Sequence, residues 1–163
     1  MAKLSSLQDL LVEQLQDLYD AEHQLTKALP KMAQAATNPQ LQKAFNTHLA
    51  ETEGHISRLE QVFQSLGEKA TRKTCKAMKG LIEEGDEVLK EDADPEVKDA
   101  ALIAAANRVE HYEIAGYGTV RTFAEQLGLN DAANLLQQIL DEEFAADQKL
   151  TKIAESRVNK QAQ

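Results

Sequence analysis

The sequence predicts an all-α fold, in which four long helices form a bundle of two antiparallel hairpins. Three observations predict it. The chain holds only 7 glycines and 3 prolines in 163 residues and is rich in helix-forming residues. Apolar residues recur every three or four positions over four long stretches, which is the period of an α-helix. Turn-forming residues separate these stretches, at Asn38-Pro39, Pro95 and Gly128.

The first hairpin is predicted over residues 1–67. Its first helix should begin at Ser5 or Ser6 and end near Ala36, after an apolar stripe made largely of leucines. Pro30 falls inside this stretch, but the apolar pattern continues beyond it. We therefore expect the proline to kink the helix rather than end it.

A second helix completes the first hairpin. Asn38 is suited to cap its N-terminus, and Pro39 is suited to its first position. The apolar stripe runs to about Leu66, and Gly67 marks the end of the helix. Because the turn between the two helices is short, we expect them to be antiparallel neighbours.

A long crossover separates this hairpin from the second. Residues 68–94 form the crossover, which contains a short fifth helix at about residues 73–90. The second hairpin is predicted over residues 95–156, with two long helices that meet in a tight turn. Residues 157–163 are predicted to be a frayed tail, and the whole chain, 1–163, to be a single domain.

Acidic residues occupy core-facing positions in all four long helices. These are Glu22, Glu51, Glu113 and Glu143. His55 and Asp147 each follow one of them by four residues and so lie on the same helical face. Glu51 follows Glu22 by 29 residues, and Glu143 follows Glu113 by 30. In antiparallel hairpins this spacing brings the four glutamates to one height.

A carboxylate is costly to bury unless it is paired or holds a metal ion. Five carboxylates and one imidazole suit iron or manganese, and two divalent ions would offset most of the negative charge. We therefore predict two iron (or manganese) ions, with this ligand set: Glu22, Glu51, His55, Glu113, Glu143 and Asp147. Support around the ligands is expected from Tyr19, Tyr112, His48, Glu110 or His111.

Two alternatives stay open at this point. Any single glutamate is explained more simply by a salt bridge across the bundle, with Lys27, Arg58, Arg108 or Lys149 as partner. Glu110 and Glu142 lie one helical step from the chosen positions. The sequence does not exclude them in place of Glu113 and Glu143.

Five segments of the chain resemble a known family. They are Leu18–Glu22, Leu29–Met32, Glu51–His55, Val109–Tyr117 and Leu140–Glu143. Together they resemble the YciE/YciF family of ferritin-like bacterial stress proteins, from about residue 7 to residue 153. The resemblance implies a ferritin-like bundle, often dimeric, with the six positions named above as metal candidates. Ferritin-like di-iron proteins commonly carry the motif Glu-x-x-His, in which the two ligands are three residues apart. Glu51 and His55 are four residues apart, which counts against classical ferroxidase activity in this chain.

Composition narrows the classes of function. The formal net charge of −9 argues against nucleic-acid binding as the main function, because such proteins need a basic face. The chain has no apolar run long enough to span a membrane, and its first residues lack the apolar core of a signal peptide. We expect a cytoplasmic homodimer.

The predicted function is that of a ferritin-like di-metal carboxylate protein of stress response. Whether the site also oxidises Fe(II) or consumes peroxide, with O₂ or peroxide as its small-molecule substrate, is left open. The alternative is a non-catalytic stress protein, either stabilised by its metal or metal-free and acting as a helical interaction module.

Overall fold

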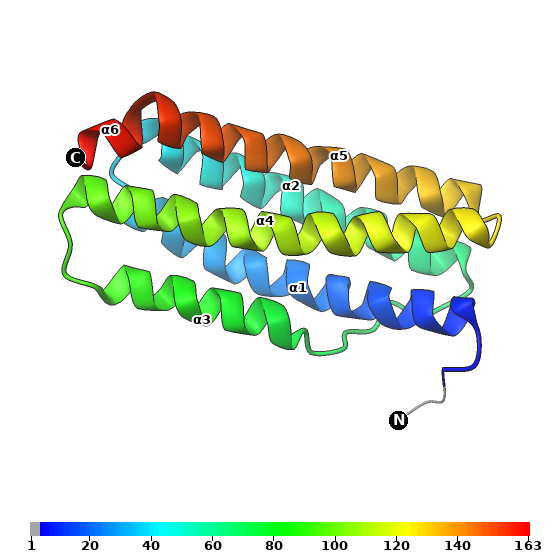
Figure 1. Cartoon of the computed structure of the whole chain (residues 1–163). Coiled ribbons are helices and arrows are strands. Elements are labelled where there is room, and N and C mark those ends of the chain that lie inside the picture. Colours follow the sequence, from blue (N-terminus) through cyan, green and yellow to red (C-terminus); the bar gives the residue numbers. More distant parts are fainter. Residues whose placement is uncertain (1–3) are drawn as a thin grey trace.

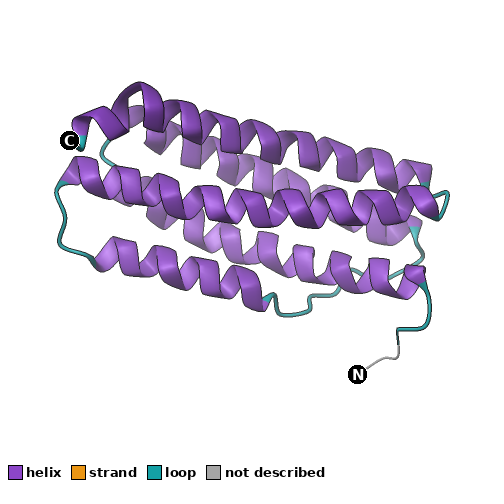
Figure 2. Ribbon diagram, in the orientation of Figure 1, coloured by secondary structure: helices purple, strands orange, loops and turns teal. Residues whose placement is uncertain are grey.

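The computed structural model describes residues 4–163, and over that range it contains helices and loops but no strand (Figures 1 and 2). The elements are α1 (Leu7–Ala35), α2 (Pro39–Ser65), α3 (Lys76–Lys90), α4 (Pro95–Gln126), α5 (Asn130–Ile153), a π-helical turn (Ala154–Val158) and α6 (Asn159–Gln161). The predicted all-α class is confirmed. Residues 1–3 lie outside the described range. They belong to the predicted first hairpin and to the N-terminal stretch that was expected to lack a signal-peptide core.

The helix ends follow from local side-chain chemistry. The Ser6 hydroxyl caps α1, and the Asn38 side chain caps α2 by accepting two backbone N–H groups. Pro39 occupies the first position of α2, and α1 continues through Pro30, as predicted. Gly67 follows α2 with φ +70°, a conformation that favours glycine.

The two long hairpins pack against each other to form the bundle. Helix α1 pairs with α2, and α4 pairs with α5; the hairpins meet where α2 contacts α5 and α1 contacts α4 (Figure 1). Helix α3 belongs to the crossover and lies along the outside, against α1 and α4. No helix in residues 4–163 is both long and apolar enough to cross a membrane.

The core divides into two apolar clusters with a polar band between them. One cluster includes Leu41, Phe45 and Leu102, and the other includes Leu15 and Leu59. Along every long helix of the bundle the residues pass from one cluster to the other. The polar side chains of the middle turns therefore meet in the interior of the bundle.

A glycine lies where α1 and α4 approach each other. A Cβ atom added to Gly116 would lie 2.7 Å from a terminal methyl carbon of Leu18. A gap of this size is too short for two carbon atoms, so the absence of a side chain lets the two helices approach beside the polar band. Gly118 has no such neighbour within 4 Å.

The C-terminal residues differ from the predicted frayed tail. They are helical as far as Gln161, and Val158 is only 1% exposed, packed in the same apolar cluster as Leu41. Burial of this valine offsets the entropic cost of ordering the last turns. The prediction of a frayed tail followed the mostly polar composition of residues 157–163 and gave too little weight to Val158.

Candidate metal centre

A cluster of buried polar side chains fills the middle of the bundle, between the two apolar clusters. We call it the central cluster. Its members are Glu22 on α1, His48 and His55 on α2, Glu110 and Glu113 on α4, and Glu143 on α5. None of them is more than 5% exposed. Four helices thus place four carboxyl groups and two imidazoles in one buried volume.

The central cluster consists of two groups that share one residue. In each group, one nitrogen or oxygen atom per residue lies within 4.8 Å of all the others. The His48 group contains His48, Glu110, Glu113 and Glu143, and the His55 group contains Glu22, His55 and Glu143. The two imidazole rings are 6.2 Å apart, centroid to centroid. Glu143 therefore stands between two adjacent candidate sites.

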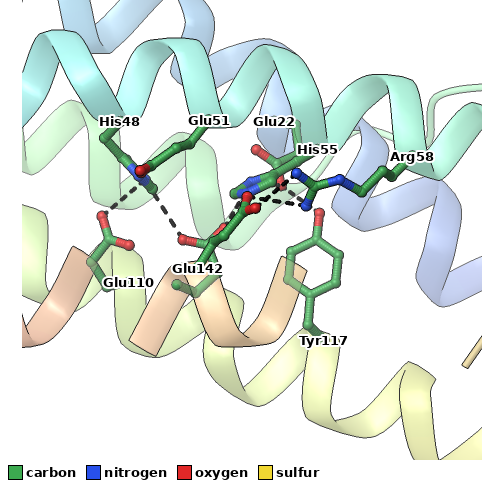
Figure 3. Close-up of polar contacts among 9 residues, drawn as sticks. Glu22, His48, Glu51, His55, Arg58, Glu110, Tyr117 and Glu142 are labelled. Carbon is green, nitrogen blue, oxygen red and sulfur yellow. Dashed lines mark hydrogen bonds and ion pairs between the residues drawn. The ribbon is translucent and has the colours of Figure 1, made fainter. Parts of the chain in front are cut away.

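His48 faces carboxylates on both sides of its ring (Figure 3). Its Nε2 lies 3.2 Å from Glu110 Oε1 and 3.6 Å from Glu143 Oε2, and its Nδ1 is hydrogen-bonded to Glu51 Oε2 at 3.1 Å. Burial alone would lower the pKa of His48, but the Glu110 and Glu51 carboxylates raise it above its ordinary value.

His55 is held more tightly. Its Nδ1 lies 3.0 Å from Glu143 Oε1 and 3.2 Å from Glu22 Oε1, and its Nε2 is 2.8 Å from Glu142 Oε2. Burial would lower the pKa of His55, but Glu143 and Glu22 raise it to about 11. Arg58 donates two hydrogen bonds to Glu142, of 2.8 and 3.0 Å. Arg58 and His55 lower the pKa of Glu142 despite its partial burial.

Glu113 is the most exceptional member of the central cluster. It is 0% exposed, and neither of its carboxyl oxygens has a hydrogen-bond partner among the described residues. Burial raises its pKa well above the ordinary value, and Glu143 and Glu22 raise it further. One oxygen each of Glu22 and Glu110 also lacks a hydrogen bond. So do both oxygens of Glu143, although they lie 3.0 Å from His55 Nδ1 and 3.6 Å from His48 Nε2.

Salt bridges to lysine or arginine do not explain these carboxyl groups. Within residues 4–163, no lysine or arginine forms an ion pair with a glutamate of the central cluster. Of the four cationic residues considered from the sequence, Arg58 alone is in an ion pair, and its partner is Glu142. The alternative of a lysine or arginine partner therefore fails. His48 and His55 lie within ion-pair distance of Glu22, Glu110 and Glu143, whereas Glu113 has no partner among the described residues.

Tyr117 adds a contact that the sequence did not single out. It is fully buried on α4, and its hydroxyl donates a hydrogen bond to Glu22 Oε1. Burial raises its pKa well above the ordinary value. Tyr117 follows Glu113 by four residues and so lies on the same helical face, a spacing that was readable in advance.

Glu51 lies beside the central cluster rather than in it. Its side chain is 36% exposed, and its one polar contact within the central cluster is with His48. Helical geometry explains this position. His48 and His55 are seven residues apart, so they point within about 20° of each other, whereas Glu51 is rotated from His48 by about 60°.

Asp147 is not brought to the central cluster. Its Oδ1 accepts a hydrogen bond from the Asn107 side chain at 2.6 Å and lies 3.2 Å from Nε2 of His111. It follows Glu143 by four residues, which rotates it by about 40° and moves it about 6 Å along α5. Its short side chain consequently reaches the outer face of α4.

Among the residues predicted to support the ligands, His48 and Glu110 belong to the central cluster itself. The other three lie elsewhere: Tyr19 donates to Glu60, Tyr112 donates to Asp17, and His111 is largely exposed. Glu110 and Glu113, between which the sequence did not decide, both lie in the central cluster. Residues three apart on a helix share one face, so both side chains reach the same interior space. Glu142 instead anchors His55 from outside.

Known proteins have chains similar to this one. Protein YciF of Escherichia coli K12 is 52% identical over 161 residues, which cover 98% of this chain and 97% of the relative. The crystal structure of that organism's stress protein YciF matches with a TM-score of 0.93, over 96% of this chain and 99% of the other. YcfI from Rhodopseudomonas palustris is 49% identical, with a TM-score of 0.91 over 93% and 97% of the two chains.

A more distant likeness concerns the fold alone. Structures described as ferritin-like, diiron-carboxylate proteins from Bacillus anthracis match with a TM-score of 0.70 at 16% identity, over 92% of this chain and 99% of the other. The ferritin-like class is thereby confirmed. The family described as a domain of unknown function, DUF892, matches residues 6–163. The predicted resemblance to YciF and its relatives is confirmed, and the chain belongs to the DUF892 family.

Proposed function

We propose that the central cluster binds two iron or manganese ions. Glu113 is the observation that carries this proposal, because a buried carboxyl group without any partner costs several kcal/mol unless a cation or a proton neutralises it. The donor set fits the ions. Four carboxylates and two imidazoles are the hard and intermediate ligands that Fe(II), Fe(III) and Mn(II) accept. The four carboxylates together carry a charge of −4, which two divalent ions would neutralise.

The two groups divide the ligands between the ions. His48, Glu110 and Glu113 would hold one ion, Glu22 and His55 the other, and Glu143 would contribute to both. Iron, when bound, would supply a redox couple at the centre of the bundle. The chain must first release protons, since a ligating imidazole nitrogen is unprotonated. Nδ1 of His55 faces Glu22 and Glu143, while Nε2 keeps its contact with Glu142.

Equilibrium dialysis tests the proposal. Full-length protein freed of metal by chelation is dialysed against Fe(II) without oxygen, or against Mn(II), and its metal is then counted by elemental analysis. We expect two ions per chain, and a large loss in Glu113→Ala. Glu53→Ala is the matched control, because Glu53 is an exposed glutamate of α2. Binding of less than one ion per chain by the unmodified protein would overturn the proposal.

Redox activity is a separate part of the proposal. The E. coli relative is described as a stress protein, and we propose a role in stress response for this chain on that basis. Oxygen uptake after addition of two equivalents of Fe(II), and peroxide consumption by the loaded protein, measure the activity. Two bound ions with neither activity would assign the chain to the non-catalytic, metal-stabilised alternative. The homodimer stays a prediction for sedimentation analysis, and the cytoplasmic location stays a prediction for cell fractionation.

A further inference from the structure

A cleft connects the His48 group to the surface. It has a volume of about 150 Å³ and lies between α2, α4 and α5. Its lining consists of Ala44, Phe45, His48, Glu51, Glu110, Ala145, Ala146, Lys149 and Leu150. His48 and Glu110 are buried and so form its inner end, whereas Ala145 and Lys149 are exposed and form its mouth. The cleft has room for several water molecules.

Glu51 lies between the mouth and the inner end of this cleft. Its side chain is 36% exposed, and its Oε2 lies 3.1 Å from His48 Nδ1, within hydrogen-bond distance. Among the described residues no lysine or arginine pairs with it. Glu142 holds the equivalent position beside His55, but there Arg58 neutralises the carboxylate. Glu51 has no such arginine within residues 4–163, so its contact with His48 leaves a partly exposed carboxylate that a cation from solvent can meet.

We propose that this cleft is the route by which divalent cations reach the central cluster, with Glu51 as the carboxylate that meets them first. The inference rests on the proposed metal binding and adds its path and order. A cation that passes Glu51 arrives at His48 and Glu110, so the His48 group fills first. The His55 group is filled next, through the shared Glu143.

Charge and lining favour a cation over a neutral molecule. Two glutamates face the cleft against one lysine, and the chain as a whole carries a net charge of −9. Negative charge concentrated in a narrow cleft attracts cations and raises the rate at which they associate. Apart from His48 at the inner end, the remaining lining residues are apolar and offer an incoming ion no competing ligand.

Stopped-flow mixing with Co(II), whose visible absorption reports protein ligands, tests the route. Ala145→Leu places a bulky side chain at the mouth without touching the central cluster. We expect binding of Co(II) to become several-fold slower while the amount bound at equilibrium stays the same. Ala104→Leu, at an exposed alanine of α4 outside the cleft, is the matched control and should bind at the normal rate.

Charge variants provide an independent measurement. Glu51→Gln retains an oxygen that can accept a hydrogen bond from His48 but removes the charge, so association should slow by about tenfold and depend less on ionic strength. Lys149→Gln removes a repelling charge from the mouth and should accelerate association. Both variants are compared with the unmodified chain at low and high salt.

The outcomes separate this inference from the proposal beneath it. If the unmodified chain binds no Co(II) at equilibrium, metal binding itself fails. If the chain binds two ions, and Ala145→Leu and Glu51→Gln bind them at the normal rate, the route is overturned while metal binding stands. Helical circular dichroism of each variant confirms that it is folded, and Glu51→Gln decides the matter should Ala145→Leu fail to fold.

Discussion

The His48 group and the His55 group use the same chemistry in different surroundings. Each combines one imidazole with buried carboxyl groups, and each imidazole has a partly exposed carboxylate behind it. Behind His55, Arg58 fixes that carboxylate with two hydrogen bonds, whereas behind His48 the carboxylate borders a cleft. In the proposed metal centre, one half would hold its geometry and the other would admit the ions.

The largest effect should come from the residue that the two groups share. Glu143→Ala removes an oxygen donor from both groups, so both ions should be lost or weakened by more than about 100-fold, beyond the effect of outer partners. Calorimetric titration with Mn(II) measures this. Retention of one tightly bound ion would show that the groups are independent and that Glu143 serves only one of them.

Single histidine variants should then separate the halves. His55→Ala and His48→Ala each remove the only imidazole of one group, so each should reduce the bound metal from two ions to one. The remaining ion should exchange quickly in His55→Ala, where the cleft-side group survives, and slowly in His48→Ala. Elemental analysis gives the number of ions, and chelator competition gives the exchange rate. Equal exchange rates in the two variants would contradict the asymmetry.

Bracing of His55 should matter less than His55 itself. Arg58→Ala frees Glu142, so His55 loses its fixed orientation and one ion should bind about 10- to 100-fold more weakly. The second ion should be unaffected. Arg121→Ala is the matched control, because Arg121 pairs with Glu125 near the surface of α4, away from both groups. A uniform weakening of both ions in Arg58→Ala would mean that the arginine supports the bundle rather than one imidazole.

The pH dependence of stability should also report on the protons held by the central cluster. In the metal-free chain, the folded-state pKa of His55 is about 11, above its ordinary 6.5. The folded chain then holds a proton that the unfolded chain loses, so this stabilisation is complete below pH 6.5 and is lost as pH rises toward 11. The free energy of unfolding should fall by up to about 1.4 kcal/mol per pH unit for such a group.

Urea denaturation in the presence of a chelator, between pH 7 and 9, measures that slope. His55→Gln and His48→Gln should each flatten it, because the pKa of each imidazole is raised in the folded state. Glu113→Gln should flatten it too, since the pKa of Glu113 is raised well above the ordinary value and its proton is retained by the folded state. An unchanged slope in all three variants would show that these groups are not charged or buried as described. Loading with metal should remove the pH dependence, because bound cations replace the protons.

Much of this arrangement was predictable from the spacing of residues along the chain. Four helices, their caps and the glutamates at 22, 113 and 143 follow from a 3.6-residue period and from short turns that fix antiparallel neighbours. The roles of His48 and Glu110 were harder to assign. Both lie on core-facing positions, but a period alone does not show how far a side chain reaches across the bundle. Small rotations decide whether an atom enters the interior or stops at its edge.

Asp147 is the clearest such case, and its variant should have the smallest effect. The sequence places Asp147 on the face of Glu143, but the structure pairs it with Asn107 and His111 outside the central cluster. Asp147→Ala should therefore leave two ions bound and alter the free energy of unfolding by no more than about 1 kcal/mol, the range of exposed ion pairs. Loss of an ion in this variant would show that α5 rotates when metal binds, which would return Asp147 to the ligand set and join the two groups more closely than the metal-free arrangement does.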